Sequence, residues 1–93
     1  MARFSLGVSP QATRDLRRIV ATSPLRSRPP IGAAALQLME QIRVDPHLKG
    51  EPAPMIGYPD MRRLDLPPLR MFFQVRQPPL EDLYVGIVGF SLV

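Results

Sequence analysis

The chain is 93 residues long (10.4 kDa), carries a formal charge of +4 and contains 12 prolines, no cysteine and one histidine, His47. This length suits a single domain spanning residues 1–93. The missing cysteines exclude a disulfide-stapled secreted scaffold and a cysteine zinc site, and we expect neither a metal nor another cofactor. With 45% hydrophobic residues the chain is too apolar for general disorder, yet no apolar run reaches the roughly 18 residues of a membrane span. Because the N-terminus also lacks an apolar core of signal-peptide length, we expect a cytoplasmic protein.

The positive charge consists almost entirely of arginine and lies in the first half of the chain. Eleven of the 12 basic residues are Arg, and residues 1–50 carry a net charge of +5 against −1 for residues 51–93. Arginine suits bidentate contacts with phosphate or carboxylate, which favours nucleic acid or an acidic protein as partner. A charge of +4 equally fits ordinary surface positions in a protein encoded by a GC-rich genome.

The first elements are a strand and a helix. Residues 2–8 alternate between apolar and polar or small side chains, which predicts a half-buried strand. Ser9 followed by Pro10 is a helix start signal, with Ser as N-cap and Pro in the first turn. Pro24 ends this helix or follows its end. The residues with helical spacing on its apolar face are Ala12, Leu16, Ile19 and Val20.

A second amphipathic helix follows a proline-rich connector. We expect it to open at Pro29 or Pro30 and to run to about Val44, where Asp45 and Pro46 stop it. Together the two helices predict a helical hairpin that covers one face of a sheet. The apolar residues of the second helix are Ile31, Ala34, Ala35, Leu38, Met39 and Ile42.

The second half of the chain predicts an irregular loop and three strands. Residues 46–60 contain four prolines and two glycines, which is typical of a loop. Residues 61–66 and 69–75 alternate and predict strands on either side of a Pro-Pro turn, and residues 83–93 are apolar on both faces, as in a central strand. The fold class is therefore α+β: a small β-α-α-β-β-β domain, with an antiparallel sheet covered on one face by the two-helix hairpin. The remaining connection, residues 77–82, is assigned to a hairpin loop.

Several segments carry a family resemblance in their order and spacing. They are the stretch that opens with Ser9-Pro10, the Asp45-Pro46 stop with its Leu-Lys-Gly continuation, and the strands at residues 61–64, 69–75 and 83–90. In this order they resemble the RelE/ParE superfamily of bacterial toxins from type II toxin–antitoxin systems, which also stabilise plasmids. The resemblance covers nearly the whole chain and implies a RelE-like fold.

Some members of this superfamily cleave RNA. For a chain of this kind, the resemblance implies a metal-independent endoribonuclease that cuts mRNA on the ribosome and so inhibits translation. A 2′-hydroxyl attacks the adjacent phosphate, so the site needs basic groups aimed at phosphorus and a group that moves protons. The resemblance assigns these roles to Arg70 and to Arg62 and Arg63 on the neighbouring strand, with Tyr84 as a further catalytic candidate. Without such a role, the arginines are solvated strand residues and Tyr84 is a cross-strand packing residue.

The end of the sequence leaves the activity open. Relatives that cleave RNA usually carry another basic residue after the last strand, whereas no basic residue follows Arg76 here. Either Tyr84 or Ser91 compensates, the set of active residues differs from that of the relatives, or the protein does not cleave RNA. The alternatives are a ParE-like inhibitor of DNA gyrase without nuclease activity, and a catalytically degenerate member that acts as a binding module.

The remaining candidates are residues for binding RNA or a protein partner. The partners that the resemblance implies are a cognate antitoxin, which wraps around the toxin, and either the ribosome with mRNA or DNA gyrase. A homodimer or a toxin–antitoxin hetero-oligomer fits the same picture. His47 is a candidate general base by its ordinary pKa range, although a lone histidine in a loop is usually a solvated residue. The binding candidates are Arg14, Arg17 and Arg18 on the first helix, Lys49, and Tyr58 in the proline-rich loop.

Overall fold

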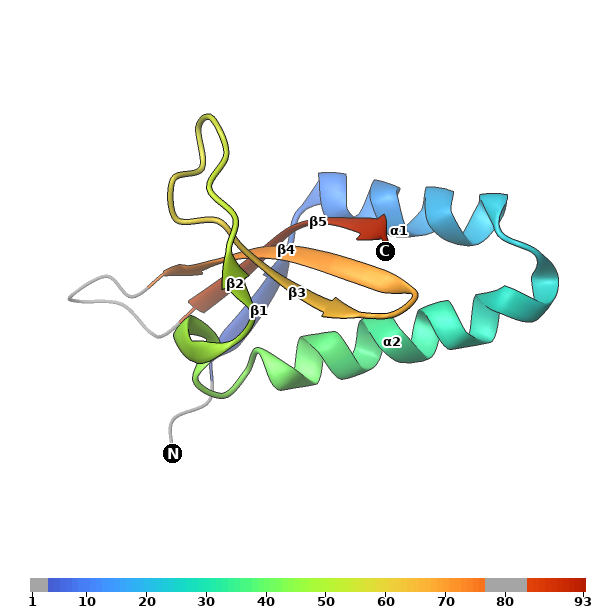
Figure 1. Cartoon of the computed structure of the whole chain (residues 1–93), viewed down its shortest axis with the longest axis horizontal. Coiled ribbons are helices and arrows are strands. Elements are labelled where there is room, and N and C mark those ends of the chain that lie inside the picture. Colours follow the sequence, from blue (N-terminus) through green and yellow to red (C-terminus); the bar gives the residue numbers. More distant parts are fainter. Residues whose placement is uncertain (1–3, 77–83) are drawn as a thin grey trace.

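The computed structural model describes residues 4–76 and 84–93 and shows two helices packed on a five-stranded sheet (Figure 1). The expected hairpin loop at residues 77–82 lies outside the described residues. Within the described part of the chain, no helix is long and apolar enough to cross a membrane. The helices are α1 (Pro10–Thr22) and α2 (Arg28–Gln41), with short 3-10 turns η1 (Leu25–Ser27) and η2 (Pro46–Leu48). The strands are β1 (Ser5–Val8), β2 (Glu51–Pro52), β3 (Arg62–Leu66), β4 (Leu69–Arg76) and β5 (Tyr84–Leu92).

The sheet is mixed, and its strand order is β1-β5-β4-β3-β2. The strand β5 lies between β1 and β4, as its apolar sequence predicted. The predicted antiparallel sheet is wrong at one edge, because β1 pairs with β5 in parallel. These two strands are joined through the rest of the domain, and a connection of that length allows parallel pairing. The remaining strand pairs are antiparallel.

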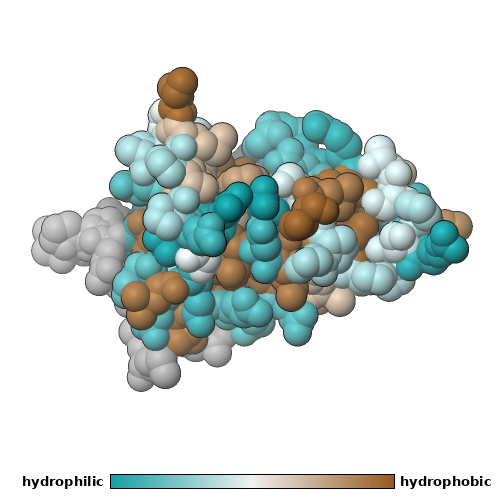
Figure 2. Space-filling view, in the orientation of Figure 1, coloured by the Kyte–Doolittle hydropathy of each residue, from teal (hydrophilic) through white to brown (hydrophobic). Residues whose placement is uncertain are grey.

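The segment predicted as a loop contains one more strand. This strand is β2, and its two residues pair antiparallel with β3, Glu51 opposite Arg63 and Pro52 opposite Arg62. A strand this short shows no alternation, and Pro52 is tolerated because β2 forms the edge of the sheet. The rest of this segment, residues 53–60, projects from the domain as a narrow loop (Figure 1). Its apolar tip, where Met55 and Ile56 are exposed, is visible in Figure 2.

Helix α1 begins where the sequence predicts, whereas α2 begins one residue before the predicted prolines and ends early. The Ser9 hydroxyl accepts a hydrogen bond from the Ala12 N–H at 3.0 Å and caps α1. Helix α2 begins at Arg28, so that the two following prolines lie in its first turn. It ends three residues before the predicted Val44. Asp45 has a left-handed conformation with φ of 47° before Pro46, and the chain leaves the helix ahead of this turn.

The core lies between the helices and one face of the sheet. Helix α1 packs on β5, and α2 packs on β4 and β3. Alternate residues of β4 and β5 face the helices, as their period of two requires. The other sheet face is covered by neither helix, and it positions the candidate site. The core residues from the sheet include Leu69, Met71, Phe73, Val85, Ile87 and Phe90, and those from the helices include Ala12, Ile19, Ile31, Ala35 and Leu38.

A bulge in β5 is held in place by the start of α1. The β4–β5 register shifts between Phe72 and Phe73, which leaves Val88 without a partner on β4. The Ser9 hydroxyl donates to the Val88 carbonyl at 3.0 Å, and the Ser9 N–H donates to the Ile87 carbonyl at the same distance. One serine therefore caps a helix and satisfies a carbonyl that the bulge removes from the sheet.

Candidate functional site

The uncovered face of the sheet carries two of the three arginines predicted as catalytic. Arg63 lies opposite Phe72, and Asp65 lies opposite Arg70. Leu64, between them on β3, packs against the core instead. The alternation predicted for this strand is therefore confirmed, and Arg63, Asp65 and Arg70 share the uncovered face.

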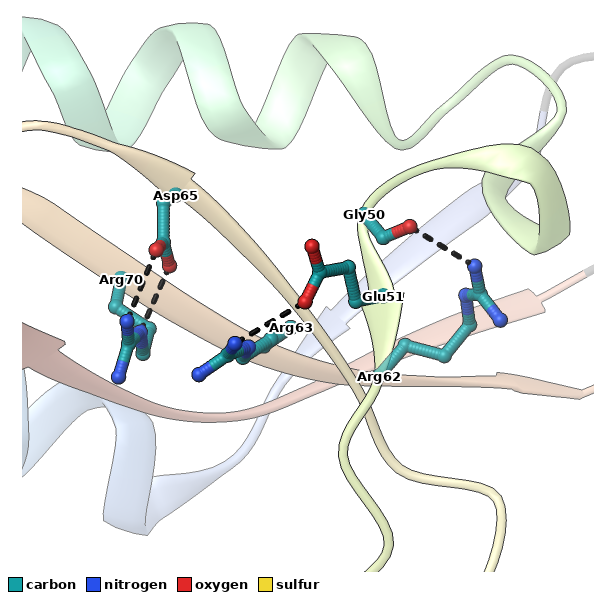
Figure 3. A network of polar contacts seen from close by, with 6 residues as sticks. All are labelled: Gly50, Glu51, Arg62, Arg63, Asp65 and Arg70. Atoms are coloured by element: carbon teal, nitrogen blue, oxygen red, sulfur yellow. Dashed lines mark hydrogen bonds and ion pairs between the residues drawn. The ribbon is translucent and has the colours of Figure 1, made fainter.

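Arg70 is bound by a carboxylate of its own chain (Figure 3). Its Nε donates to Asp65 Oδ1 at 2.8 Å and its Nη2 donates to Asp65 Oδ2 at 3.0 Å. This bidentate pair lowers the pKa of Asp65, mainly through the hydrogen bonds from Arg70 and further through the positive charges of Arg70 and Arg63. The Arg70 side chain is 29% exposed and the Asp65 side chain is 36% exposed. One complete edge of the Arg70 guanidinium is therefore occupied, and its charge is locally balanced.

Arg63 and Arg62 are also engaged within the chain, but on different sides of the sheet (Figure 3). Arg63 Nη2 lies 3.1 Å from Glu51 Oε2 on the neighbouring strand β2. Arg62 donates through Nε to the Lys49 carbonyl at 3.0 Å and through Nη2 to the Gly50 carbonyl at 3.3 Å. Adjacent strand residues point to opposite faces. Arg62 therefore binds the carbonyl groups of the segment before β2 and does not lie on the face that carries Arg63 and Arg70.

Residues 49–50, which precede β2, can approach β3 closely because residue 50 is a glycine. Its φ is +65°, and a Cβ atom at this position would collide with the carbonyl oxygen of Arg63. A glycine therefore allows residues 49–50 to present their carbonyl groups to Arg62.

Tyr84 lies at the other end of the sheet from Arg70. In the β4–β5 register, Tyr84 is opposite Arg76, whereas Arg70 is opposite Ser91. Six residues of extended strand separate the two positions along β4, which corresponds to about 20 Å. The structure therefore does not bring Tyr84 together with the arginines that the resemblance grouped with it.

Tyr84 instead lines a cleft with two of the predicted binding residues. This tyrosine cleft lies where β1, β5 and β4 meet the start of α1 and the projecting loop, and its volume is about 1,050 Å³. Arg14 and Tyr58 line it together with Tyr84. Arg76 and Gln74 of β4 also line it, and sequence reasoning had not singled them out for a functional role. The sequence feature that could have indicated Gln74 and Arg76 is their position near the end of β4, the strand that pairs with β5 at Tyr84.

The other predicted residues lie apart from these two places. Arg17 lines an apolar groove of about 540 Å³ between α1 and α2, and Arg18 is exposed. Lys49 is half-buried and takes part through its backbone carbonyl. His47 is exposed and lines a third cleft, of about 420 Å³, together with Asp60 and Arg62.

The carboxylates were the main feature that the catalytic prediction missed. Asp65 and Glu51 are the direct partners of Arg70 and Arg63. In the residues that the structure describes, no group of three or more His, Cys, Asp or Glu side chains is placed to hold a metal ion.

Comparison with known proteins gives the family of this domain. Residues 6–90 match the family model of the ParE toxin of the type II toxin–antitoxin system parDE. The chain belongs to this ParE toxin family. It is thus a type II toxin–antitoxin toxin of the RelE/ParE superfamily, as the order of its segments predicted. No curated protein sequence matches the chain.

Two solved structures share the fold of this ParE-family chain. The toxin–antitoxin complex RelBE2 from Mycobacterium tuberculosis has a chain that matches with a TM-score of 0.72 at 16% identity, covering 100% of this chain and 94% of that one. The chromosomal ParDE toxin–antitoxin system from P. aeruginosa gives a TM-score of 0.66 at 23% identity, with coverage of 98% and 97%. The predicted RelE-like α+β fold is therefore confirmed along nearly the whole length of the chain.

Proposed function

We propose that this ParE-family toxin inhibits DNA gyrase by binding to it and does not cleave RNA. The observation that carries the proposal is the pairing of Arg70 with Asp65 and of Arg63 with Glu51. Stabilising the charge of a phosphorane-like transition state requires cationic donors that are free to face the phosphate. On this sheet face both cations already have a carboxylate partner, and an incoming phosphate would meet two negative charges beside them.

The placement of the proton-transfer candidates supports the same proposal. Tyr84 is about 20 Å from Arg70 along the strand, and His47 lines a separate cleft with Asp60 and Arg62. Gyrase is the target that the ParE branch of the resemblance implies, and the family match lies in that branch. A cognate antitoxin would neutralise the toxin, since both structural neighbours come from toxin–antitoxin systems.

The second candidate function is ribosome-dependent mRNA cleavage. Arg63 and Arg70 share one uncovered sheet face, and this is the observation that favours it. For this function, the RNA phosphate would have to replace Asp65 and Glu51 as the partner of the two arginines. Replacing Asp65 with Asn should then increase cleavage, because it frees the Arg70 guanidinium.

Two assays on the same protein separate these functions. The purified chain is added to gyrase with relaxed plasmid, and in parallel to translating ribosomes whose mRNA is mapped by primer extension. We expect loss of supercoiling with intact mRNA, and we expect Arg70→Ala to inhibit as well as wild type. Arg26→Ala, which removes an exposed arginine in η1, is the matched control.

Each alternative has its own result in these assays. Cleaved mRNA that disappears in Arg70→Ala but persists in Arg26→Ala would overturn the gyrase proposal in favour of the ribonuclease. Normal supercoiling together with intact mRNA would overturn both and leave a binding module. Binding of the antitoxin is measured separately, by co-expressing the toxin with the product of each neighbouring gene and testing for co-purification.

A further inference from the structure

The tyrosine cleft combines aromatic surface with two arginines that have no carboxylate partner among residues 4–76 and 84–93, and the proposed function uses neither feature. The cleft lies at the end of the sheet away from Arg70, and its walls come from α1, the projecting loop and three strands. Its volume of about 1,050 Å³ lies just above the usual range of about 300–1,000 Å³ for small-molecule sites.

Both tyrosines of the chain line this cleft. The Tyr84 ring lies directly over Gly7 on the neighbouring strand, where a Cβ atom would collide with the ring hydroxyl. On its other side, a Cβ atom at Gly86 would be 3.5 Å from Tyr84 Cε1. Gly7 thus lets the ring lie against the sheet, whereas a side chain at residue 86 would make only ordinary contact with the ring. Tyr84 remains 39% exposed and Tyr58 42% exposed, so both rings offer surface on which a planar base can stack.

Among the described residues that line the cleft, the two charged side chains are arginines. Arg14 and Arg76 are exposed, and no acidic residue is found among the described residues that line the cleft. Arg14 donates to Gln11 Oε1 at 3.1 Å, and Gln11 in turn donates to Asp15 at 2.7 Å. This neutral contact orients Arg14 and leaves its other donors available. Arg63 and Arg70, in contrast, are each held by a carboxylate.

We propose that the tyrosine cleft binds a free nucleotide, with its phosphates on Arg14 and Arg76 and its base stacked on a tyrosine. Arginine is suited to phosphate because its planar donors match the phosphate oxygens. A longer single strand would need a basic track beyond the cleft. The adjoining sheet face does not supply one, because its arginines are paired with Asp65 and Glu51. This binding site is independent of the toxin's target, and its test does not depend on gyrase.

The test is a titration of the full-length chain with ATP and with GTP by isothermal calorimetry. Because the chain contains no tryptophan and both tyrosines line the cleft, tyrosine fluorescence corrected for nucleotide absorption reports on the same site. We expect saturable binding with one nucleotide per chain. Arg14→Gln and Arg76→Gln should each raise Kd by about tenfold, as expected for one lost charge-assisted hydrogen bond.

Variants of the aromatic and control positions complete the test. Tyr58→Phe should keep the affinity, whereas Tyr58→Ala should raise Kd by about fivefold or more through the loss of stacking. Arg26→Gln removes the same charge outside the cleft and should leave Kd unchanged. These positions are exposed, so thermal melts should show each variant folded.

Three results would overturn the proposal. The first is no saturable binding of either nucleotide at millimolar concentration. The second is an equal loss of affinity in Arg26→Gln and Arg14→Gln, which would indicate general charge attraction. The third is binding of a single-stranded oligonucleotide at least a hundredfold tighter than ATP, with a steep dependence on salt, which would assign the cleft to a nucleic acid strand.

Discussion

The carboxylate of Asp15 in α1 accepts a hydrogen bond from the backbone N–H of Phe90 in β5, at 3.2 Å and across 75 residues of sequence. The bond falls two residues after the β5 bulge at Val88 and beyond the last pair of β1 with β5, Val8 with Ile87. Gly89 makes the approach possible, since a Cβ atom there would lie 2.9 Å from Asp15 Oδ2. Helix α1 is thereby attached to the central strand by a polar contact beside the apolar core.

Replacing Asp15 with Ala should destabilise the domain by about 1–3 kcal/mol, the cost of leaving a partly buried N–H group without an acceptor. Asp15→Asn should cost less, because its amide oxygen can still accept the bond. The free energy of unfolding is measured by urea denaturation. Gln11→Ala is the control, because it removes only exposed bonds, those of Gln11 with Asp15 and with Arg14. Equal effects of Asp15→Ala and Gln11→Ala would contradict this role of Asp15.

Ser9 performs two functions with one hydroxyl, and two substitutions separate them. Ser9→Ala removes both the cap of α1 and the bond to the Val88 carbonyl, and we expect a loss of about 1–2 kcal/mol. Ser9→Asp keeps a capping acceptor but cannot donate to Val88, so its stability should lie between those of Ser9→Ala and wild type. Urea denaturation ranks the three proteins, and Ser5→Ala on the exposed side of β1 serves as the control. An Asp variant as stable as wild type would show that the Val88 bond contributes nothing.

The two adjacent phenylalanines of β4 should differ strongly in their contribution to stability. Phe73 is fully buried against the helices, whereas Phe72 is half-buried on the uncovered face. Phe73→Ala should therefore cost about 3–5 kcal/mol. Phe72→Ala should cost clearly less, and thermal or urea unfolding of the two variants provides the comparison. The reverse ranking would mean that β4 has the opposite face toward the core.

The local elements of this domain could be predicted because their signals lie close together in the sequence. Ser9 and Pro10 mark the start of α1, and alternation on both sides of the Pro67-Pro68 turn places Leu66 opposite Leu69. The same register places Asp65 opposite Arg70, so the sequence alone was sufficient to predict their ion pair. It was missed because Arg70 was interpreted as a catalytic cation or a solvated strand residue, and Asp65 was not considered as its partner.

The features that could not be predicted depend on contacts between distant segments. Parallel pairing of β1 with β5 joins the two ends of the domain, and neither strand contains a signal for the direction of its partner. The tyrosine cleft likewise combines Arg14, Tyr58 and Tyr84 from three separate elements. Tyr84 was grouped with Arg70 through the family resemblance, and only the strand register shows that they lie at opposite ends of the sheet.

The ion pair between Asp65 and Arg70 should make stability depend on pH in the acid range. The pKa of Asp65 is held below its ordinary value of 3.8, chiefly by the hydrogen bonds from Arg70. A carboxyl group whose pKa is lower in the folded state stabilises the fold when it is ionised. The contribution of the Asp65 carboxylate to the free energy of unfolding is therefore complete when the pH is above the ordinary pKa of the group. It is lost as the pH falls through the lower pKa of the folded state.

Asp65→Asn isolates this contribution, because it removes the ionisable group of the pair and leaves every other carboxyl group in place. The free energy of unfolding is measured for wild type and Asp65→Asn from about pH 6 to about pH 2. We expect wild type to be the more stable protein at pH 6, by a small margin because the pair is partly exposed, and the difference to disappear toward pH 2. In an Arg70→Ala background the same Asn substitution should have little effect at any pH. A difference that stays constant across the range would show that Asp65 stabilises the hairpin without its charge.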